Sequence, residues 1–265
     1  MKFLILGSRG MLGSMAKSFF EKKHEVIVFD QRFSQSTFNS YLHYIKELDF
    51  DVLLNCIGRI PQKSLNYDEL YLSNTLLPKH LAEIEKDFLL VHPSTDCVFS
   101  GLDRKDPYRF DEPHDFKDDY GFTKSAAESF VLKRSDSLVI RTSIIGTTPQ
   151  KNSKGLLDWY LNQDDHASLK GYTNHHWNGI TTLEWCKFLT KLIEEKYFLE
   201  NNLMQVSSSH SISKYELLLK FKKIFEKKSD IEKFETEKSI NRTLKGQIEL
   251  KSIDKQLVDL RDFEV

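Results

Sequence analysis

The chain opens with MKFLILGSRGMLGSMAKSFF (residues 1–20), and this stretch decides the fold. Residues 3–6 are an uninterrupted apolar run, as expected of a strand that is buried on both faces. Glycines in the spacing GxxGxxG follow at once, and residues 10–20 have the pattern of a helix. A glycine turn between a buried strand and a helix is typical of a dinucleotide-binding site. The opening therefore predicts the first βα unit of a parallel sheet.

Strands and helices continue to alternate as far as about residue 146. The predicted strands are residues 25–29, 51–55, 88–91 and 137–141, and the predicted helices are residues 41–48, 66–86 and 120–132. Pro78 lies inside the second of these helices, where it would kink or split it. The repeated βα order predicts an α/β fold of the Rossmann type, a doubly wound parallel sheet with helices on both faces.

The pattern weakens in the second half of the chain. Residues 182–198 and 212–225 predict helices and residues 204–207 a strand, whereas the charged residues that follow give no clear assignment. We interpret residues 1–145 as an NAD(P)-binding Rossmann domain. We interpret residues 146–265 as the completion of the sheet together with a small C-terminal substrate-binding lobe. The boundary is soft, because the two parts are expected to interleave.

Composition narrows the partners. The 265 residues include 38 Lys and Arg against 39 Asp and Glu, a net charge of -1, which excludes a strong field for nucleic acid or an anionic membrane. No apolar run approaches the roughly 20 residues that span a bilayer, and the N-terminal run is too short for a signal peptide. The three cysteines are odd in number and lack metal-ligand spacing. We therefore expect a cytoplasmic protein with free thiols and no metal.

Each glycine of the turn has a separate role in a dinucleotide site. Gly7 permits the tight turn, Gly10 lets the backbone approach a pyrophosphate, and Gly13 allows close packing of helix and strand. The free N–H groups at the start of the helix then face the phosphates. The candidate cofactor residues of this segment are Gly7, Arg9, Gly10, Met11, Leu12 and Gly13.

The choice between NAD(H) and NADP(H) rests on three charged residues. Asp30 ends the second strand, 17 residues after Gly13, near the offset of roughly 20 expected for an acid on the adenosine ribose. A carboxylate there favours the free 2′-hydroxyl of NAD(H). Arg9 and Arg32 favour NADP(H), since either guanidinium could hold its 2′-phosphate, unless both are solvated surface charges. We favour NADP(H) slightly, because a reductive step usually draws on that pool.

Residues 120–124, YGFTK, place Tyr120 and Lys124 four positions apart on one face of a predicted helix. An ammonium beside a phenol stabilises the phenolate and lowers its pKa, so that the phenol can exchange a proton with a carbonyl oxygen. Thr95 follows the fourth strand at the carboxyl edge of the sheet, where ligands bind in such folds. Thr95, Tyr120 and Lys124 are therefore the candidate catalytic residues, with Ser94 in place of Thr95 if the register differs by one.

The chain resembles the extended short-chain dehydrogenase/reductase superfamily, and within it the dTDP-4-dehydrorhamnose reductase family. The matching segments occur in the family's order across about the first 145 residues, with looser matches at residues 177–182 and 212–218. They are residues 7–13 (GSRGMLG), 54–58 (LNCIG), Asn74, 94–99 (STDCVF), 120–124 (YGFTK) and 141–143 (RTS). The turn at residues 7–13 is also similar to that of GDP-fucose synthase, in which the arginine lies by the NADP phosphate.

The resemblance implies a role for each matched residue. Tyr120 would donate the proton, Lys124 would hold the nicotinamide ribose, and Thr95 would orient the carbonyl. Asn74 would lie behind the site, bridging backbone or water. The resemblance further implies three cofactor residues, Cys56, Ile57 and Gly58, and two residues near the sugar, Asp96 and Val98.

The function implied is NAD(P)H-dependent reduction of a keto group, at C4, on a deoxysugar linked to a nucleoside diphosphate, for surface polysaccharide or a related glycan. The sequence leaves the oligomeric state open, with a homodimer as one option. Departures from the family lie around the substrate, where Cys97 and Ile144 stand at positions that are often aromatic. Trp177 would supply a stacking face for the sugar or pack within a loop. Arg242 is read as an exposed arginine rather than a diphosphate ligand.

Two alternatives remain from the sequence. A nucleotide-sugar epimerase or dehydratase would share the turn and the YxxxK, but dehydratases usually carry an Asp-Glu pair after the threonine. Here Thr95 is followed by Asp96 and Cys97, so the glutamate is missing. A non-catalytic regulatory subunit is the other alternative, since the chain also resembles the β subunit of methionine adenosyltransferase. The presence of all three catalytic residue types favours an enzyme over that alternative.

Overall fold

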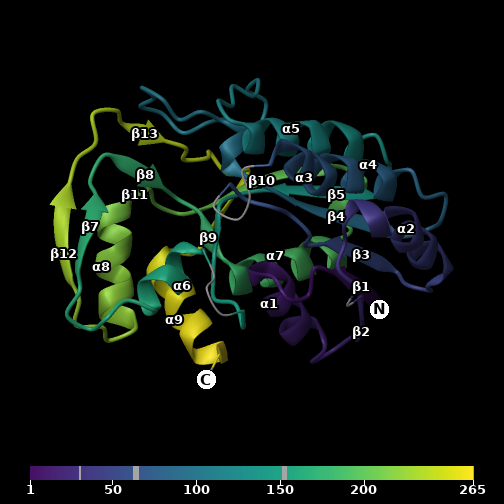
Figure 1. The fold of residues 1–265 in the computed structure, drawn as a ribbon, viewed down its shortest axis with the longest axis horizontal. Helices are drawn as coiled ribbons and strands as arrows, with labels where there is room; N and C mark the ends of the chain where they lie inside the picture. Colours follow the sequence, from purple (N-terminus) through teal and green to yellow (C-terminus); the bar gives the residue numbers. More distant parts are fainter. Residues whose placement is uncertain (30, 62–65, 151–153, 265) are drawn as a thin grey trace.

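The chain folds around a parallel sheet of seven strands, as a computed structural model shows for residues 1–29, 31–61, 66–150 and 154–264 (Figure 1). In spatial order the strands are β14 (Ile248–Leu250), β10 (Leu203–Ser208), β5 (Ser137–Arg141), β4 (Leu89–Ser94), β3 (Val52–Asn55), β1 (Lys2–Leu6) and β2 (Glu25–Phe29). Neighbouring strands pair in parallel throughout this order. From β1 the chain first adds β2 on one side and then returns to add β3 on the other, so the topological switch point lies between β1 and β3. Ligands bind at this point in open α/β sheets.

Helices cover both faces of the sheet. They are α1 (Met11–Phe20), α2 (Phe38–Glu47), α3 (Tyr67–Tyr71), α4 (Leu77–Ala82), α5 (Asp119–Val131), α6 (Leu156–Leu161), α7 (Thr182–Glu194), α8 (Lys214–Ile224) and α9 (Ile253–Glu264). In Figure 1, α2, α4 and α5 lie on one side of the sheet and α1 and α7 on the other. The predicted Rossmann-type fold is confirmed. Among the described residues, no helix has the length and apolar character needed to cross a membrane.

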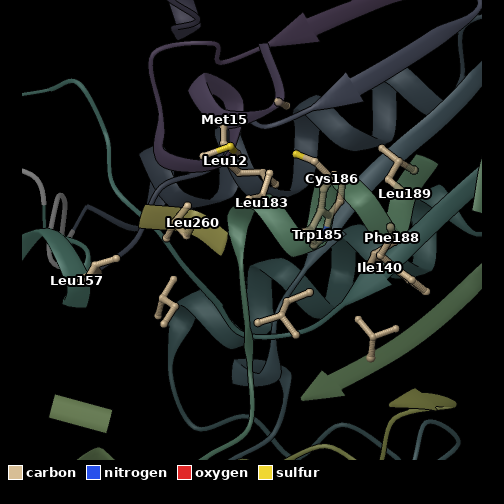
Figure 2. Packing of buried hydrophobic residues seen from close by; sticks show 14 of the residues in the cluster. Leu12, Met15, Ile140, Leu157, Leu183, Trp185, Cys186, Phe188, Leu189 and Leu260 are labelled. Atoms are coloured by element: carbon tan, nitrogen blue, oxygen red, sulfur yellow. The ribbon is translucent and has the colours of Figure 1, made fainter. Parts of the chain in front are cut away.

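Alternation along β1 divides the core into two layers. Phe3 and Ile5 join the cluster that contains α1 and α7, whereas Leu4 and Leu6 join the cluster that contains α2 and α4. Successive side chains of a strand point to opposite faces, so a strand covered on both faces is apolar at every position. Figure 2 shows the first layer from close by, with Leu12 and Met15 of α1 beside Leu183 of α7.

The predicted helix at residues 66–86 is split. It consists of α3, a π-helical turn at Leu72–Leu76 and α4, which ends at Ala82. Pro78 lies in the first turn of α4 and has no N–H to donate, so the regular hydrogen-bond ladder cannot run through it. The split predicted at Pro78 is thus present, and it takes the form of a wider turn just before the proline. That turn carries Asn74, which the site uses.

The second half of the chain contributes to two places. β10, β14, α7 and α9 extend the main sheet and its cover. The remainder, at the left of Figure 1, packs α8 against a parallel pair of strands and beside a three-stranded sheet. These strands are β7 (Ser168–Tyr172), β12 (Asp230–Phe234), β8 (His175–Trp177), β11 (Ile212–Ser213) and β13 (Ile240–Asn241), and the short pair β6 (Ile144–Ile145) and β9 (Ile180–Thr181) lies between the parts.

Two predicted ends in this half are wrong. The helix predicted at residues 182–198 ends as α7 at Glu194, because Lys196 adopts a left-handed conformation (φ 51°) and a separate 3₁₀ turn follows. The helix predicted at residues 212–225 begins later, at Lys214. Ser213 caps it by accepting the Glu216 N–H at 3.1 Å, while residues 212–213 pair as β11.

The two-layer core predicts where the chain is sensitive to truncation. Leu138 of β5 is fully buried, so Leu138→Ala is expected to lower the free energy of unfolding by about 2–5 kcal/mol through lost burial and a residual cavity. Leu219→Ala is the matched control, since Leu219 on α8 is 38% exposed and should lose less than about 1 kcal/mol. Urea denaturation followed by circular dichroism measures both. Equal losses in the two variants would contradict this account of the core.

Candidate active site

A cavity of about 450 Å³ opens at the crevice between the carboxyl ends of β1 and β3. Its walls come from both halves of the chain. They include the glycine turn at Gly10, the end of β3 at Cys56, the turn after β4 at Thr95, and Tyr120 of α5. Lys214 of α8 closes the far side. The candidate residues of the first half and residues of the small lobe therefore share one space.

The glycine turn is built so that backbone, rather than side chain, faces the cavity. Gly7 has φ +75°, and a Cβ there would lie 2.9 Å from the carbonyl carbon of Cys56. A Cβ on Gly13 would lie 2.2 Å from the carbonyl oxygen of Gly7. Gly10 precedes the first residue of α1, and no side chain caps the free N–H groups there. This cradle fits the pyrophosphate of a dinucleotide, because those N–H groups and the helix dipole favour an anion.

The end of β3 provides the facing wall. Cys56, Ile57 and Gly58 all line the cavity, as the resemblance implied. Asn74 fixes this segment, because its side chain accepts the Arg59 N–H at 2.8 Å and donates to the Arg59 carbonyl at 3.0 Å. The role expected of Asn74, bridging backbone behind the site, is therefore present in the structure. Met11 and Leu12 of α1 complete this end of the cavity.

Of the charged residues weighed for cofactor choice, the two that the structure describes, Arg9 and Arg32, do not line the cavity. Asp30 lies outside the described residues, so its predicted contact with the ribose stays a prediction. Arg9 is exposed beside the turn, and its carbonyl accepts the Thr148 hydroxyl at 3.3 Å. Arg32 is exposed as well, on the segment that follows β2. Both guanidiniums therefore lie on the surface near the end of the sheet at which the turn lies.

Thr95 and Tyr120 line the same cavity from separate elements, close enough that the Thr95 side chain acts to lower the pKa of the Tyr120 phenol. The Thr95 hydroxyl itself donates to the Asp96 carboxylate at 3.1 Å and accepts the Cys97 N–H at 3.1 Å. Gly121 makes the approach possible, because a Cβ at that position would lie 2.4 Å from the Cys97 carbonyl oxygen. Asp118 caps α5 by accepting the Gly121 N–H at 2.7 Å. The glycine in YGFTK thus has a purpose that the motif alone did not reveal.

Lys124 is held beneath this pair. Its ammonium donates to the Pro93 carbonyl at 2.7 Å and lies 3.2 Å from Nε2 of His92, both in β4. Burial lowers the pKa of Lys124 to about 8, against the opposing effect of the nearby Glu128 carboxylate. The group is thus charged at neutral pH and close to losing its proton in mild alkali.

The pKa of Tyr120 differs from the sequence-based expectation. Burial, together with the neighbouring Cys97, raises the pKa of Tyr120 above its ordinary value, and the Thr95 side chain opposes the rise. The expectation that Lys124 lowers this pKa is not met in the structure, because the dry surroundings of the phenol outweigh a cation held by Pro93 and His92. A protonated Tyr120 is suited to act as an acid.

Ser94, the alternative to Thr95, is committed elsewhere. Its hydroxyl donates to the Glu128 carboxylate, which also binds Arg141 through two bonds of 3.1 and 2.6 Å. Arg141 in turn lies 2.8 Å from Nε2 of His114. Both Ser94 and Thr95 line the cavity, but the Ser94 hydroxyl is held by this buried network.

The predicted substrate residues divide into two groups. Asp96 and Trp177 line the cavity, and the Trp177 indole donates to the Ser143 hydroxyl at 2.8 Å. Val98 does not lie where the resemblance implied, near the sugar. Its side chain is fully buried in a small cluster with Phe99 and does not line the cavity. The 3₁₀ turn at Asp96–Val98 causes this, since it aims alternate residues differently from a strand.

Sequence reasoning missed two cations of the site. Lys214 lines the cavity with its ammonium 5.1 Å from the centre of the Trp177 ring, and burial lowers its pKa to about 8. Arg242, read as an exposed arginine, also lines the cavity, with its guanidinium donating to the Ser100 carbonyl at 3.2 Å and lying 3.6 Å from the Cys97 sulfur. That reading of Arg242 is wrong. The capping box at Ser213 and Glu216, which fixes where α8 begins, was the available signal for Lys214.

These features define an α/β protein with a glycine turn and a cluster of polar side chains at the carboxyl edge of its sheet. The chain belongs to the family described as the RmlD substrate binding domain, whose model matches residues 1–239. This match covers most of the 265 residues and confirms the resemblance drawn from the sequence motifs.

Individual relatives agree with the family. The chain is similar to the spore coat polysaccharide biosynthesis protein SpsK of Bacillus subtilis (strain 168), with 32% identity over 152 residues, 54% of this chain and 52% of that protein. It is also similar to a dTDP-4-dehydrorhamnose reductase of Mycolicibacterium smegmatis, with 29% identity over 148 residues, 54% and 45% of the two chains. Each match thus spans about half the length of the relative.

The fold is shared with a solved dTDP-4-dehydrorhamnose reductase from Bacillus anthracis in complex with NADP. The TM-score is 0.84 at 18% identity, with 98% of each chain covered. At that identity the likeness establishes the fold, which here extends over nearly the entire length of both proteins.

The packing at Gly13 predicts a sharp effect of one added methyl group. In Gly13→Ala the new Cβ would meet the Gly7 carbonyl, so the turn must open and nicotinamide dinucleotide affinity should fall by at least about tenfold. Ser14→Ala is the control, because it removes only a hydroxyl that donates to the Met11 carbonyl at 3.2 Å. Isothermal titration with NADPH and NADH measures both. Unchanged affinity in Gly13→Ala would show that the turn does not hold the dinucleotide.

Proposed function

We propose that the protein is a nicotinamide-dependent reductase of a keto group on a nucleoside-diphosphate sugar. The observation that carries the proposal is that Thr95, Tyr120 and Lys124 line the same cavity as the glycine turn and the end of β3. A carbonyl placed against the Thr95 and Tyr120 hydroxyls would be polarised by two donors at once. Membership of the RmlD family supports this assignment.

Gly7, Gly10 and Gly13 would hold the pyrophosphate of the cofactor, with Cys56 to Gly58 along its other side. When bound, the cofactor supplies a hydride. We favour NADP(H), because Arg9 lies beside the turn and the Bacillus anthracis neighbour is a complex with NADP. Asp30 is the residue that would favour NAD(H) instead.

The residues of this chain would do three things in the reaction. Thr95 orients the carbonyl oxygen of the substrate by donating a hydrogen bond. Tyr120 transfers its phenolic proton to that oxygen, so the carbonyl becomes a hydroxyl and Tyr120 becomes a phenolate. Lys124 stabilises the phenolate with its positive charge until a proton from solvent restores the phenol. The raised pKa of Tyr120 keeps it protonated, and so ready to donate, over the neutral range.

The substrate side favours a sugar attached to a diphosphate. Lys214 and Arg242 bring two cations to the lining of the cavity, where they could bind an anionic handle, and Asp96 and Trp177 line the same space. We propose a 4-keto deoxysugar as the reacting part, and residues 146–265 as the main source of the substrate-binding lobe. The similarity to a spore coat polysaccharide protein supports a role in glycan precursor synthesis.

A dehydratase is the second candidate, and the turn after β4 argues against it. Cys97 follows Asp96 where a second acid would be needed. Burial raises the pKa of the Cys97 thiol to about 12, so that thiol cannot replace a carboxylate as a base near neutral pH. Reduction needs no such base, and it is the activity that this set of groups supports.

The Tyr120→Phe variant tests the proposed chemistry. It removes the donated proton and keeps the ring, so kcat for reduction is expected to fall by about 10²–10⁴-fold. Absorbance of NADPH and NADH is followed against a panel of 4-keto nucleotide sugars, with Tyr44→Phe as control, since Tyr44 is exposed on α2. Dinucleotide affinity should be retained in both variants. Tight dinucleotide binding without turnover of any panel member by the unchanged protein would favour the regulatory alternative.

The pKa of Lys214 predicts how substrate affinity depends on pH. Lys214 is charged below its pKa of about 8, so KM for the nucleotide sugar should be low at pH 7 and rise as pH passes through 8. The diphosphate diester does not titrate in that range, and Lys214→Arg should therefore make KM nearly independent of pH from about 7 to 9. Steady-state KM values across this range provide the measurement. A rise in KM that persists in Lys214→Arg would assign it to another group.

A further inference from the structure

The Lys124 ammonium has three N–H donors, and the structure assigns two of them to β4. One donates to the Pro93 carbonyl at 2.7 Å, and a second points at Nε2 of His92, 3.2 Å away. The third is the donor left for the cavity that Lys124 lines. With two donors tied to one rigid strand, the direction of the third is set by β4 rather than by the flexible lysine side chain.

His92 is suited to accept that bond. It is 1% exposed, and burial together with the Lys124 charge keeps its pKa well below the ordinary value, so the ring is neutral. A neutral imidazole has one nitrogen free to accept a hydrogen bond. We infer that His92 is a positioning residue for the proposed reduction, accepting a hydrogen bond from the Lys124 ammonium at Nε2 and so holding it charged and aimed at the cavity.

The inference fixes the tautomer of the ring. With Nε2 accepting, the proton of neutral His92 resides on Nδ1, which lies 3.4 Å from the amide nitrogen (Nδ2) of Asn55 in the structure. In the structure the amide oxygen of Asn55 accepts the Ile57 N–H at 3.3 Å. The inference requires the amide to be turned over so that its oxygen faces the ring, and that hydrogen bond is then lost. The two ends of an amide have the same shape, so the exchange requires no movement of the backbone.

The ionisable groups that face Lys124 come from three elements. They are His92 from β4, Cys56 after β3 and Glu128 from the same helix, and Glu128 is the one that favours the charged ammonium. Burial acts in the opposite direction and lowers the pKa of Lys124 to about 8. Loss of the His92 acceptor would remove a hydrogen bond to the charged form, so the pKa of Lys124 would fall further.

The kinetic test compares two substitutions of His92. In His92→Leu the alkaline limb of the kcat–pH profile should move down by about one pH unit, with about fivefold less activity at pH 8. In His92→Gln a side-chain oxygen can replace Nε2 as acceptor, and the limb should return close to its original position. His43→Leu, on the exposed side of α2, is the matched control. A uniform loss of kcat with an unmoved limb in His92→Leu would mean that His92 only packs, and would overturn the inference.

A second measurement needs neither a variant nor a substrate. In the full chain labelled with ¹⁵N-histidine, the His92 Nε2 resonance should be that of an unprotonated ring nitrogen from about pH 6 to pH 9. A proton on Nε2 of the neutral ring would overturn the inference, even where His92→Leu does not fold. The inference rests on the proposed reductase function for its kinetic arm. Absence of turnover by the unchanged protein would count against that function, whereas the tautomer decides the role of His92 separately.

Discussion

The active site depends on one buried ion pair, between Glu128 of α5 and Arg141 of β5. Both residues are 2% exposed, and two charge-assisted bonds of 3.1 and 2.6 Å join them. Burying two charges costs desolvation energy, which only good geometry and further hydrogen bonds offset. Here Ser94 of β4 donates to Glu128, while Arg141 also reaches the side chain of Gln205 on β10 at 3.0 Å. The pair therefore fixes one helix against three strands.

The spacing along α5 carries this constraint to the chemistry. Tyr120, Lys124 and Glu128 are successive residues four apart, so all three lie on one face of the helix. Glu128 anchors that face to the sheet, Lys124 donates to the Pro93 carbonyl one turn earlier, and Tyr120 lines the cavity a turn earlier still. A rotation of α5 that misplaced Tyr120 would also break the buried pair. The position of the Tyr120 hydroxyl is thus stabilised by the Glu128–Arg141 ion pair, two turns away along the helix.

Sequence patterns predicted the first half of the molecule, where each helix or strand has a recognisable pattern in its own residues. The strand at residues 25–29 is recognisable from its apolar run. The glycine turn is recognisable because only glycine fits its backbone at Gly7 and Gly13. The small lobe lacks such signals. β12 has one buried residue in five, and it is a strand because it pairs in parallel with β7, some sixty residues away in the chain. Arg242 was misread for the same reason, since its approach to Cys97 depends on that lobe being folded.

The two halves of the chain differ in how well the sequence predicts them because they form different walls of the cavity, one from backbone and one from side chains. The wall that we propose for the cofactor is formed by backbone, and Gly7 and Gly13 tolerate no side chain there. The glycine spacing that it requires can therefore be recognised in the sequence. The wall that we propose for the substrate is built from side chains such as Lys214 and Arg242, carried by segments that meet only after folding. Because neither cation belongs to the Glu128–Arg141 network, exchanging them would alter which anionic substrate fits without disturbing how Tyr120 is held. Specificity can therefore vary on this scaffold while the acid–base geometry stays constant.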